Sequence, residues 1–172
     1  MRYTIISTMP KNGEDARKAI EDLTAALPAP DVIYTEGMNI HGCIGCNDCW
    51  LKTPGICSVK DDYEQIFIKI LQSDRIIFIA EAKRGFVSYK AKDLLDRILP
   101  IATMHLKFEK GQMRHYNRYN KRVDMGLLFN GDGDLEFLRM WMNRVTLNFG
   151  SECFGVYEIS HRKELCNALG CN

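Results

Sequence analysis

The chain has 172 residues, which is enough for one domain with a full hydrophobic core and no need of disulfides. Its 23 Lys and Arg residues nearly balance its 22 Asp and Glu residues, so overall charge gives no argument for nucleic acid or an anionic membrane as partner. The first residues do not resemble a secretory signal, and no run approaches the ~18 apolar residues that span a bilayer. We therefore expect a cytoplasmic protein whose thiols stay reduced.

Strand and helix patterns alternate along the chain. Short apolar, β-branched runs predict five strands, at residues 3–7, 32–35, 76–80, 125–129 and 154–159. Helical spacing of apolar residues predicts helices at 16–27, after Asp61-Asp62, from Ser88 to Pro100, and at 135–147. This alternation predicts one α/β domain over residues 1–172, a flavodoxin-like three-layer sandwich with a five-stranded parallel sheet in the order 2-1-3-4-5.

In such a fold, ligands bind where the parallel strands end. The loops expected there are residues 9–13, the cysteine segment described next, residues 81–87 and residues 130–134. The last of these lacks the length and closing glutamate of a calcium loop and predicts a turn followed by a helix cap.

Four of the seven cysteines lie in the segment 42–58, namely Cys43, Cys46, Cys49 and Cys57. The spacing of the first three curls the chain tightly enough to aim several thiolates at one centre, and Gly42, Gly45 and Gly55 permit the positive φ that such turns use. A [4Fe–4S] cluster is the first hypothesis, and zinc bound by four cysteines is its nearest rival. Metal-free thiols in a loop, or disulfides formed in air, are the remaining alternatives.

The cysteine block with Asp61-Asp62, and a second block of Gly85-Phe-Val87-Ser88, Lys92 and Asp96-Arg97, carry a family resemblance. From Tyr3 to about Ile159 the chain resembles the iron–sulfur flavoprotein branch of the flavodoxin-like NAD(P)H-dependent FMN reductases. The resemblance implies FMN as cofactor, with a cluster beside the flavin that passes single electrons. It also implies NAD(P)H or a redox carrier as partner, and a homo-oligomer that completes the flavin sites.

The first flavin loop of that family cradles the FMN phosphate at a helix N-terminus. The residues here that fit this role are Ser7, Thr8, Lys11, Asn12 and Gly13. Glu14 and Asp15 depart from the family pattern, and their carboxylates would either repel a phosphate or only complement the helix dipole.

The second flavin loop of the family places aromatic rings against the flavin. The residues here at its positions are Lys83, Arg84, Gly85, Val87 and Ser88. Lys83 and Arg84 replace the aromatic platform with positive charge, which favours an anionic flavin or another anionic ligand, or is a pair of solvated loop charges.

Residues 107–122 interleave basic and aromatic side chains. Such a stretch suits single-stranded nucleic acid, the phosphates of NADPH, an oligomer contact, or a solvated connection to the fourth strand. The nearly neutral chain does not favour nucleic acid, and we expect the solvated connection. Cys153 is expected to be a small buried residue, whereas Cys166 and Cys171 lie in a tail without an assigned element.

The leading functional hypothesis is an FMN-dependent oxidoreductase or electron-transfer flavoprotein, with a [4Fe–4S] cluster at the four clustered cysteines. The alternative is a non-catalytic zinc-binding or regulatory module with a decayed flavin site, suggested by Glu14, Asp15 and the missing aromatic rings. No Ser–His–Asp or paired-carboxylate pattern is present, so the sequence assigns no catalytic residue.

Overall fold

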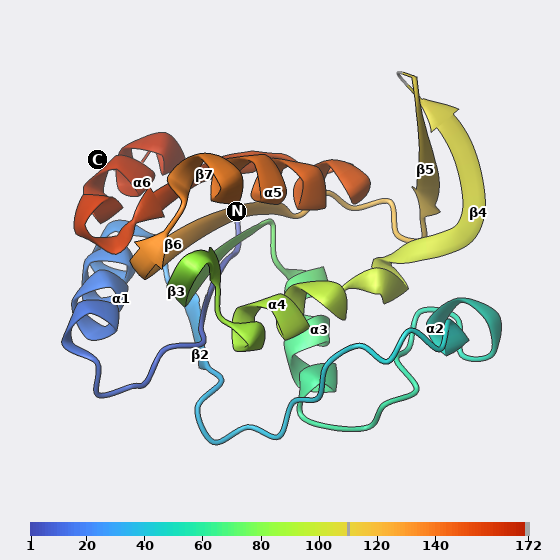
Figure 1. The fold of residues 1–172 in the computed structure, drawn as a ribbon, viewed down its shortest axis with the longest axis horizontal. Helices are drawn as coiled ribbons and strands as arrows, with labels where there is room; N and C mark the ends of the chain where they lie inside the picture. The colour runs from blue at the N-terminus through green and yellow to red at the C-terminus, as the bar shows by residue number, and fades with distance from the viewer. Residues whose placement is uncertain (110, 171–172) are drawn as a thin grey trace.

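A computed structural model describes residues 1–109 and 111–170. Within these residues one sheet contains five parallel strands in the order β2-β1-β3-β6-β7 (Figure 1). The strands are β1 Tyr3–Ser7, β2 Asp31–Tyr34, β3 Arg75–Val87, β6 Asp124–Gly133 and β7 Cys153–Glu158. The predicted strands and the flavodoxin-like order, 2-1-3-4-5 when the sheet strands alone are counted, are confirmed.

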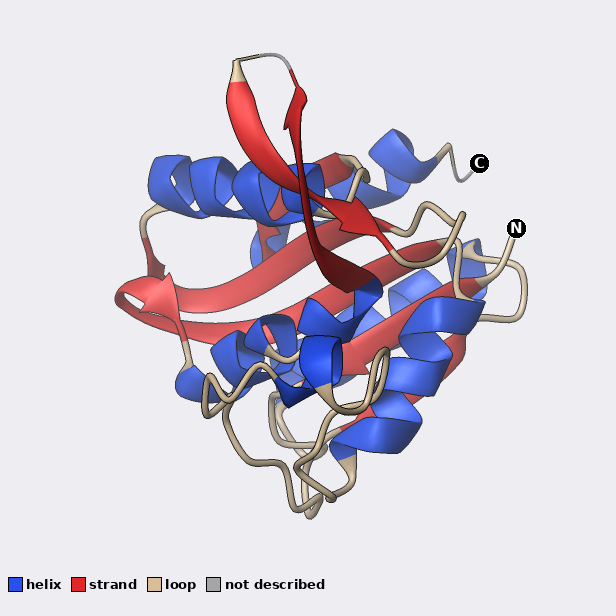
Figure 2. Cartoon of the chain, turned by 90° about the vertical axis from the view of Figure 1, so that its right-hand side faces the viewer, coloured by secondary structure: helices blue, strands red, loops and turns tan. Residues whose placement is uncertain are grey.

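Helices cover both faces of the sheet (Figure 2). On one face lie α1 Glu14–Ala26 and α6 Arg162–Leu169, and on the other lie α3 Tyr63–Gln72, α4 Tyr89–Asp96 and α5 Leu135–Asn148. Alternate strand residues face opposite layers, so Ile5 and Ile77 pack toward α1 whereas Ile6 and Phe78 pack toward α3 and α4. Cys166 lies on α6, and Cys171 is outside the described residues.

Two central strands are longer than the sequence indicates. Residues 81–87, expected to be a loop, continue β3 and pair with the end of β6. The turn within this extension lies at Arg84 and Gly85, which both have positive φ (56° and 82°), and the Ser88 amide donates to the Glu81 carbonyl. Hydrogen bonds to β6 hold this segment as a strand, and residue types alone do not reveal them. The predicted cap after β6 is present, since the Asp134 carboxylate accepts from the Phe137 amide.

The basic stretch is not a simple connection. It forms most of an antiparallel hairpin, β4 Ala102–Glu109 and β5 Gln112–Asn117, that projects from the sheet (Figure 2). The helix α4 ends at Asp96 and not, as the sequence predicts, at Pro100. A short 3-10 turn, η1 Leu99–Ile101, then leads into the hairpin. Most basic side chains of residues 107–122 form hydrogen bonds or ion pairs, namely Lys107, Arg114, Arg118, Lys121 and Arg122. Lys110 lies outside the described residues.

Two short elements complete the described chain, α2 Asp48–Leu51 in the cysteine segment and η2 Ile159–His161 before α6. Among the described residues, no helix combines the length and the apolar character needed to cross a membrane.

Candidate functional site

The cysteine segment wraps along one side of the molecule between β2 and α3 (Figure 1). Its sharp turns use positive φ at Gly45 (69°), Asn47 (60°) and Gly55 (87°), as expected for the two glycines; Gly42 is not among the residues with positive φ. Gly42 instead packs closely on α4, where a Cβ would lie 2.8 Å from an Asp93 carboxylate oxygen.

The four thiols of the segment differ in exposure and surroundings. Cys43 and Cys46 are exposed, whereas Cys49 and Cys57 are half-buried. A hydrogen bond with the Ser58 hydroxyl, 3.3 Å away, lowers the pKa of the Cys46 thiol. Burial raises the pKa of Cys49, and the other three thiols of the set raise it further because each carries negative charge when ionised. The other three predicted ligands are thus near enough to act electrostatically on Cys49.

The spacing of these thiols bears on which metal they suit. Among the described residues, no three His, Cys, Asp or Glu side chains are grouped closely enough to hold a single metal ion. Zinc with Zn–S bonds of about 2.3 Å needs its sulfurs only ~3.8 Å apart, whereas the corners of a cubane cluster spread its ligands more widely. Both candidates, a cluster and a zinc ion, would need the thiols to be drawn together around the metal.

A buried ion pair lies beneath the segment. Arg97, at the end of α4, places Nη1 2.5 Å from Asp61 Oδ2, and the two side chains are 1% and 0% exposed. Asp61 also accepts hydrogen bonds from the His41 and Tyr63 amides. Burial alone would raise the pKa of the Asp61 carboxyl, but hydrogen bonds from Arg97, His41 and Tyr63 hold it below its usual value.

Arg97 also supplies an observation about the expected cofactor. Its Nη2 donates to the Cys57 sulfur at 3.4 Å, and its Nε is buried without a hydrogen-bond partner among the described residues. An unmet donor of a guanidinium beside a cysteine ligand fits a group rich in sulfur acceptors. The residues present are therefore compatible with an iron–sulfur cluster.

Trp50 connects the segment to the rest of the molecule. Its indole nitrogen donates to the Leu99 carbonyl at 3.0 Å, and its ring lies 4.7 Å from the His115 ring at the base of the hairpin. Since Trp50 follows Cys49 directly, this contact fixes α2 against β4 and β5.

The loop expected to bind phosphate lies between β1 and α1. The Ser7 and Thr8 side chains are buried and hydrogen-bonded to main-chain groups, and the Thr8 hydroxyl donates to the Ile79 carbonyl. Gly13 is the N-cap of α1 and provides no side-chain cap, so the amides of the first turn can bind an anion. Asn12 is exposed beside them. The backbone of this loop fits a phosphate.

Carboxylates around this loop disfavour the binding of a phosphate. Glu14 pairs with Lys18, which lowers the pKa of its carboxyl, and Asp15 accepts a hydrogen bond from Asn130. Glu36, for which no sequence pattern indicates a role, accepts a hydrogen bond from the Lys11 amide at 3.0 Å. A phosphate in this loop would have to displace the Glu36 carboxylate.

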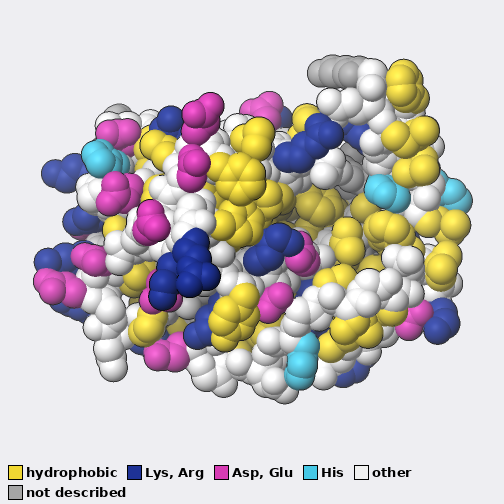
Figure 3. Space-filling view, in the orientation of Figure 1, with side chains coloured by type: hydrophobic (Ala, Val, Ile, Leu, Met, Phe, Trp, Pro, Cys, Tyr) yellow, Lys and Arg dark blue, Asp and Glu magenta, His cyan; other side chains and the backbone are white. Residues whose placement is uncertain are grey.

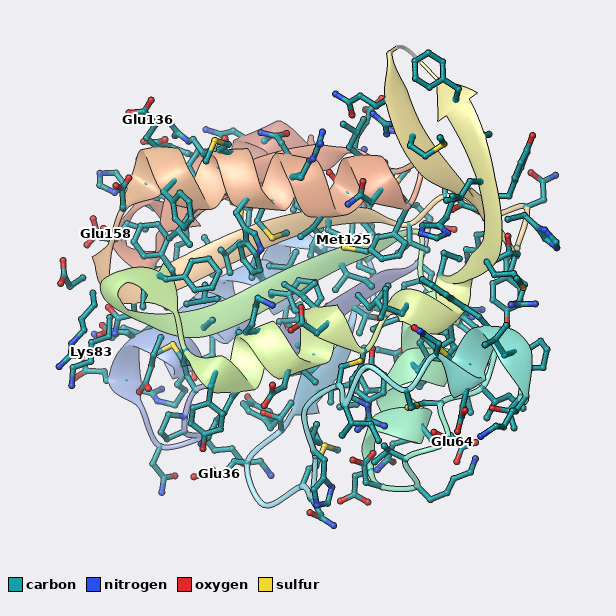
Figure 4. The ribbon with its side chains drawn as sticks, turned by 45° about the vertical axis from the view of Figure 1, so that its right-hand side comes forward. Glu36, Glu64, Lys83, Met125, Glu136 and Glu158 are labelled. Atoms are coloured by element: carbon teal, nitrogen blue, oxygen red, sulfur yellow. The ribbon has the colours of Figure 1, made fainter. Side chains whose placement is uncertain are left out.

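The second candidate loop turns at the end of β3. Lys83 and Arg84 are exposed, Val87 is buried, and Ser88 is the N-cap of α4. Figure 4 shows Lys83 and Glu36 at the same side of the molecule, far from Glu64 at the start of α3. The structure therefore brings both predicted flavin loops to one end of the molecule, and the cysteine segment runs from the end of β2 toward α2 (Figure 1).

The only aromatic ring of the second loop packs against α5. Phe86 packs on α5, with its ring centroid 4.8 Å from Trp141. A cavity of about 180 Å³ lies between the end of β2 and α4, lined in part by Glu36, Met38 and the exposed Tyr89. It is smaller than the pockets that usually enclose a small-molecule cofactor. This cavity alone is thus too small to enclose a flavin.

The fold and these features define a flavodoxin-like α/β protein with a cysteine-rich segment. No protein-family model matches the chain. One curated relative, an iron–sulfur flavoprotein of Methanocaldococcus jannaschii, is 39% identical over 85 residues, which are 49% of this chain and 43% of the relative. A second iron–sulfur flavoprotein of that organism is 29% identical over 93 residues, 54% and 41% of the two chains. The chain thus spans less than half the length of these relatives.

Solved structures match over nearly the whole chain. An NAD(P)H:quinone oxidoreductase from Methanothermobacter marburgensis superposes with a TM-score of 0.61 at 14% identity, covering 100% of this chain and 98% of that one. An FMN-dependent NADH-azoreductase from Bacillus anthracis, solved in complex with FMN, gives 0.56 at 13% identity, covering 99% of each chain. Together the comparisons show distant homology to iron–sulfur flavoproteins and a flavodoxin-like fold.

Proposed function

We propose that the protein is an FMN-dependent oxidoreductase or electron-transfer flavoprotein that carries a [4Fe–4S] cluster on Cys43, Cys46, Cys49 and Cys57. The observation that carries the proposal is the set of four free thiols on one short segment, beside a buried arginine that donates to one of them. The distant homology to proteins named iron–sulfur flavoproteins supports it. The thiols require a reducing compartment, such as the cytoplasm.

FMN would be held at the end of the sheet where the two predicted loops meet. The uncapped amides of α1 and Lys11 would bind its phosphate, and Lys83 and Arg84 would place positive charge near an anionic flavin. When bound, FMN exchanges hydride with a nicotinamide and single electrons with a cluster. NAD(P)H as electron donor is suggested by the names of the matched oxidoreductases.

Anaerobic reconstitution with iron, sulfide and FMN tests this function. We expect cluster absorbance, quenching of FMN fluorescence on binding, and bleaching of the flavin bands by NADH or NADPH. Stoichiometric zinc without flavin binding would instead support the zinc-binding regulatory module. Absence of both iron-dependent and flavin bands would refute the proposal.

The charge of Glu36 should limit FMN affinity. Replacing Glu36 by Ala frees the Lys11 amide and removes a negative charge, so we expect FMN to bind about tenfold more tightly, with a gain that shrinks as salt rises. Fluorescence titration measures the dissociation constant. Glu14→Gln is the matched control, because the Glu14 carboxylate already pairs with Lys18 and should matter less. Equal affinities for the wild type and Glu36→Ala would show that the phosphate does not bind in this loop.

We also propose that two copies assemble, because the cavity beside the predicted flavin loops of one chain is too small for a flavin. Apolar side chains gather over the hairpin (Figure 3), and those at least half exposed are Met104, Leu106, Phe108, Met113 and Tyr116. Apolar surface of this kind is typical of protein contacts.

The hairpin should therefore be needed for self-association. Phe108 is 75% exposed at its tip, and replacing Phe108 by Ser should shift the protein toward the monomer in light scattering coupled to size-exclusion chromatography. Ile68→Ser, which removes an exposed apolar side chain of α3 away from both the hairpin and the predicted flavin loops, should leave the mass unchanged. A wild type that is already monomeric at tens of micromolar would contradict the assembly.

A further inference from the structure

Two sequence blocks that carry the family resemblance, Asp61-Asp62 and Asp96-Arg97, meet in the structure. The Arg97 guanidinium reaches both ends of the cysteine segment: Nη1 donates to the His41 carbonyl at 3.1 Å, and Nη2 donates to the Val59 carbonyl at 3.1 Å. The same Nη2 lies 3.4 Å from the Cys57 sulfur. One side chain thus joins the start of the segment, its end and one predicted ligand to α4.

The residues around Arg97 fix the orientation of its guanidinium. Asp61 binds Nη1, and the Tyr63 ring lies 4.5 Å from the guanidinium carbon. The Tyr63 hydroxyl in turn donates to the Leu94 carbonyl of α4 at 2.9 Å. A buried ion pair is a weak source of net stability, since well-packed apolar residues often replace one without loss. The role of the Asp61–Arg97 pair is better explained by the groups that the oriented guanidinium contacts than by net stability.

A cation in this position has a defined effect on a cluster. The reduced state of an iron–sulfur cluster carries one more negative charge, so a positive charge and hydrogen bonds at its sulfurs stabilise that state and raise the reduction potential. Exposed cations are screened by solvent and salt, whereas Arg97 is 2% exposed. The buried Nε has no hydrogen-bond partner within residues 1–109 and 111–170, which leaves one further donor in the same group.

We propose that Arg97 is a positioning residue for the cluster: it closes residues 41–59 around the metal site and, oriented by Asp61, keeps a positive charge at Cys57 that raises the reduction potential. This inference rests on the proposed function. It assigns to the Asp61–Arg97 pair a role in cofactor retention and redox tuning.

The test compares Arg97→Gln and Arg97→Lys with the wild type after anaerobic reconstitution. Arg97→Gln should lower cluster affinity about 10–100-fold, measured as iron lost to a chelator, and should give a more negative midpoint potential in a dithionite titration. Arg97→Lys keeps the charge but not the forked hydrogen bonds, so its potential should lie between the two. Lys92→Gln, which removes a half-exposed cation of α4, is the control and should match the wild type. Arg97→Gln with wild-type iron retention and potential would overturn the inference.

A second measurement separates this inference from the function on which it rests. In apo protein, hydrogen exchange of residues 41–59 should be faster in Arg97→Gln than in Lys92→Gln. If Arg97→Gln alone does not fold, the double variant Asp61→Asn, Arg97→Gln removes both buried charges and serves instead. A wild type that takes up no cluster refutes the proposed function and the redox role, while the exchange data still decide whether Arg97 closes the segment. Unchanged exchange overturns that role as well.

Discussion

Replacing Asp61 by Asn is expected to lower the free energy of unfolding by about 3–5 kcal/mol at neutral pH. The substitution keeps the shape of the side chain but leaves the buried Arg97 charge without its counter-ion. For a chain of this length the melting temperature should fall by about 10 °C. Chemical denaturation with circular dichroism measures the change. A loss below about 1 kcal/mol would mean that solvent reaches Arg97 in solution.

The stability difference between the wild type and Asp61→Asn should depend on pH. The pKa of Asp61 is lower in the folded protein than in the unfolded chain, so its contribution is fully present above the unfolded value of about 3.9 and is lost as pH falls through the folded value. The difference in stability between the wild type and Asp61→Asn should therefore be constant near neutrality and should shrink below about pH 4. A difference that persists in acid would point to lost packing rather than lost charge.

Removing two cysteines of the segment should abolish the cluster. In the double variant Cys46→Ala, Cys49→Ala, two thiolates remain for a cofactor that uses four, so iron and sulfide per chain should fall below about a tenth of the wild-type values. The matched control is Cys153→Ala, Cys166→Ala, which removes two cysteines outside the segment and should retain the cluster. Iron and sulfide assays with visible absorbance measure both.

Equal iron content in these two double variants would show that the segment is not the metal site. Loss of iron in both would indicate a general effect of cysteine removal on folding, which circular dichroism would reveal. FMN binding should survive in both variants, because none of the substituted cysteines lies in either predicted flavin loop.

The sheet could be predicted because each of its strands is a short apolar run between helical patterns. The hairpin was missed although its signal was present: residues 102–109 alternate between apolar and polar types, as a strand does. The density of charge in 107–122 favoured a solvated connection instead. The extension of β3 had no such signal, since it depends on pairing with β6, more than 40 residues later.

The site was predicted only where its residues are close in sequence. The cysteines form a local motif, but the contact of Arg97 with Asp61 joins residues 36 positions apart. One clue was available: Arg97 follows Leu94 by three positions and so shares the inward face of its helix, where an unpaired charge is costly. Glu36 had no comparable signal, because its hydrogen bond to the Lys11 amide depends on how two loops meet.

Because Trp50 contacts His115, the fluorescence of Trp50 can report on the cysteine segment and on the hairpin. The chain has two tryptophans, and they lie in different regions: Trp50 beside Cys49, and Trp141 on α5 against Phe86. In a Trp141→Phe background, all indole emission would come from a ring adjoining the cysteine segment and touching the hairpin. Iron uptake would quench that emission directly, and loosening of α2 from the hairpin would shift it toward the red, so one fluorescence trace could follow both events in real time.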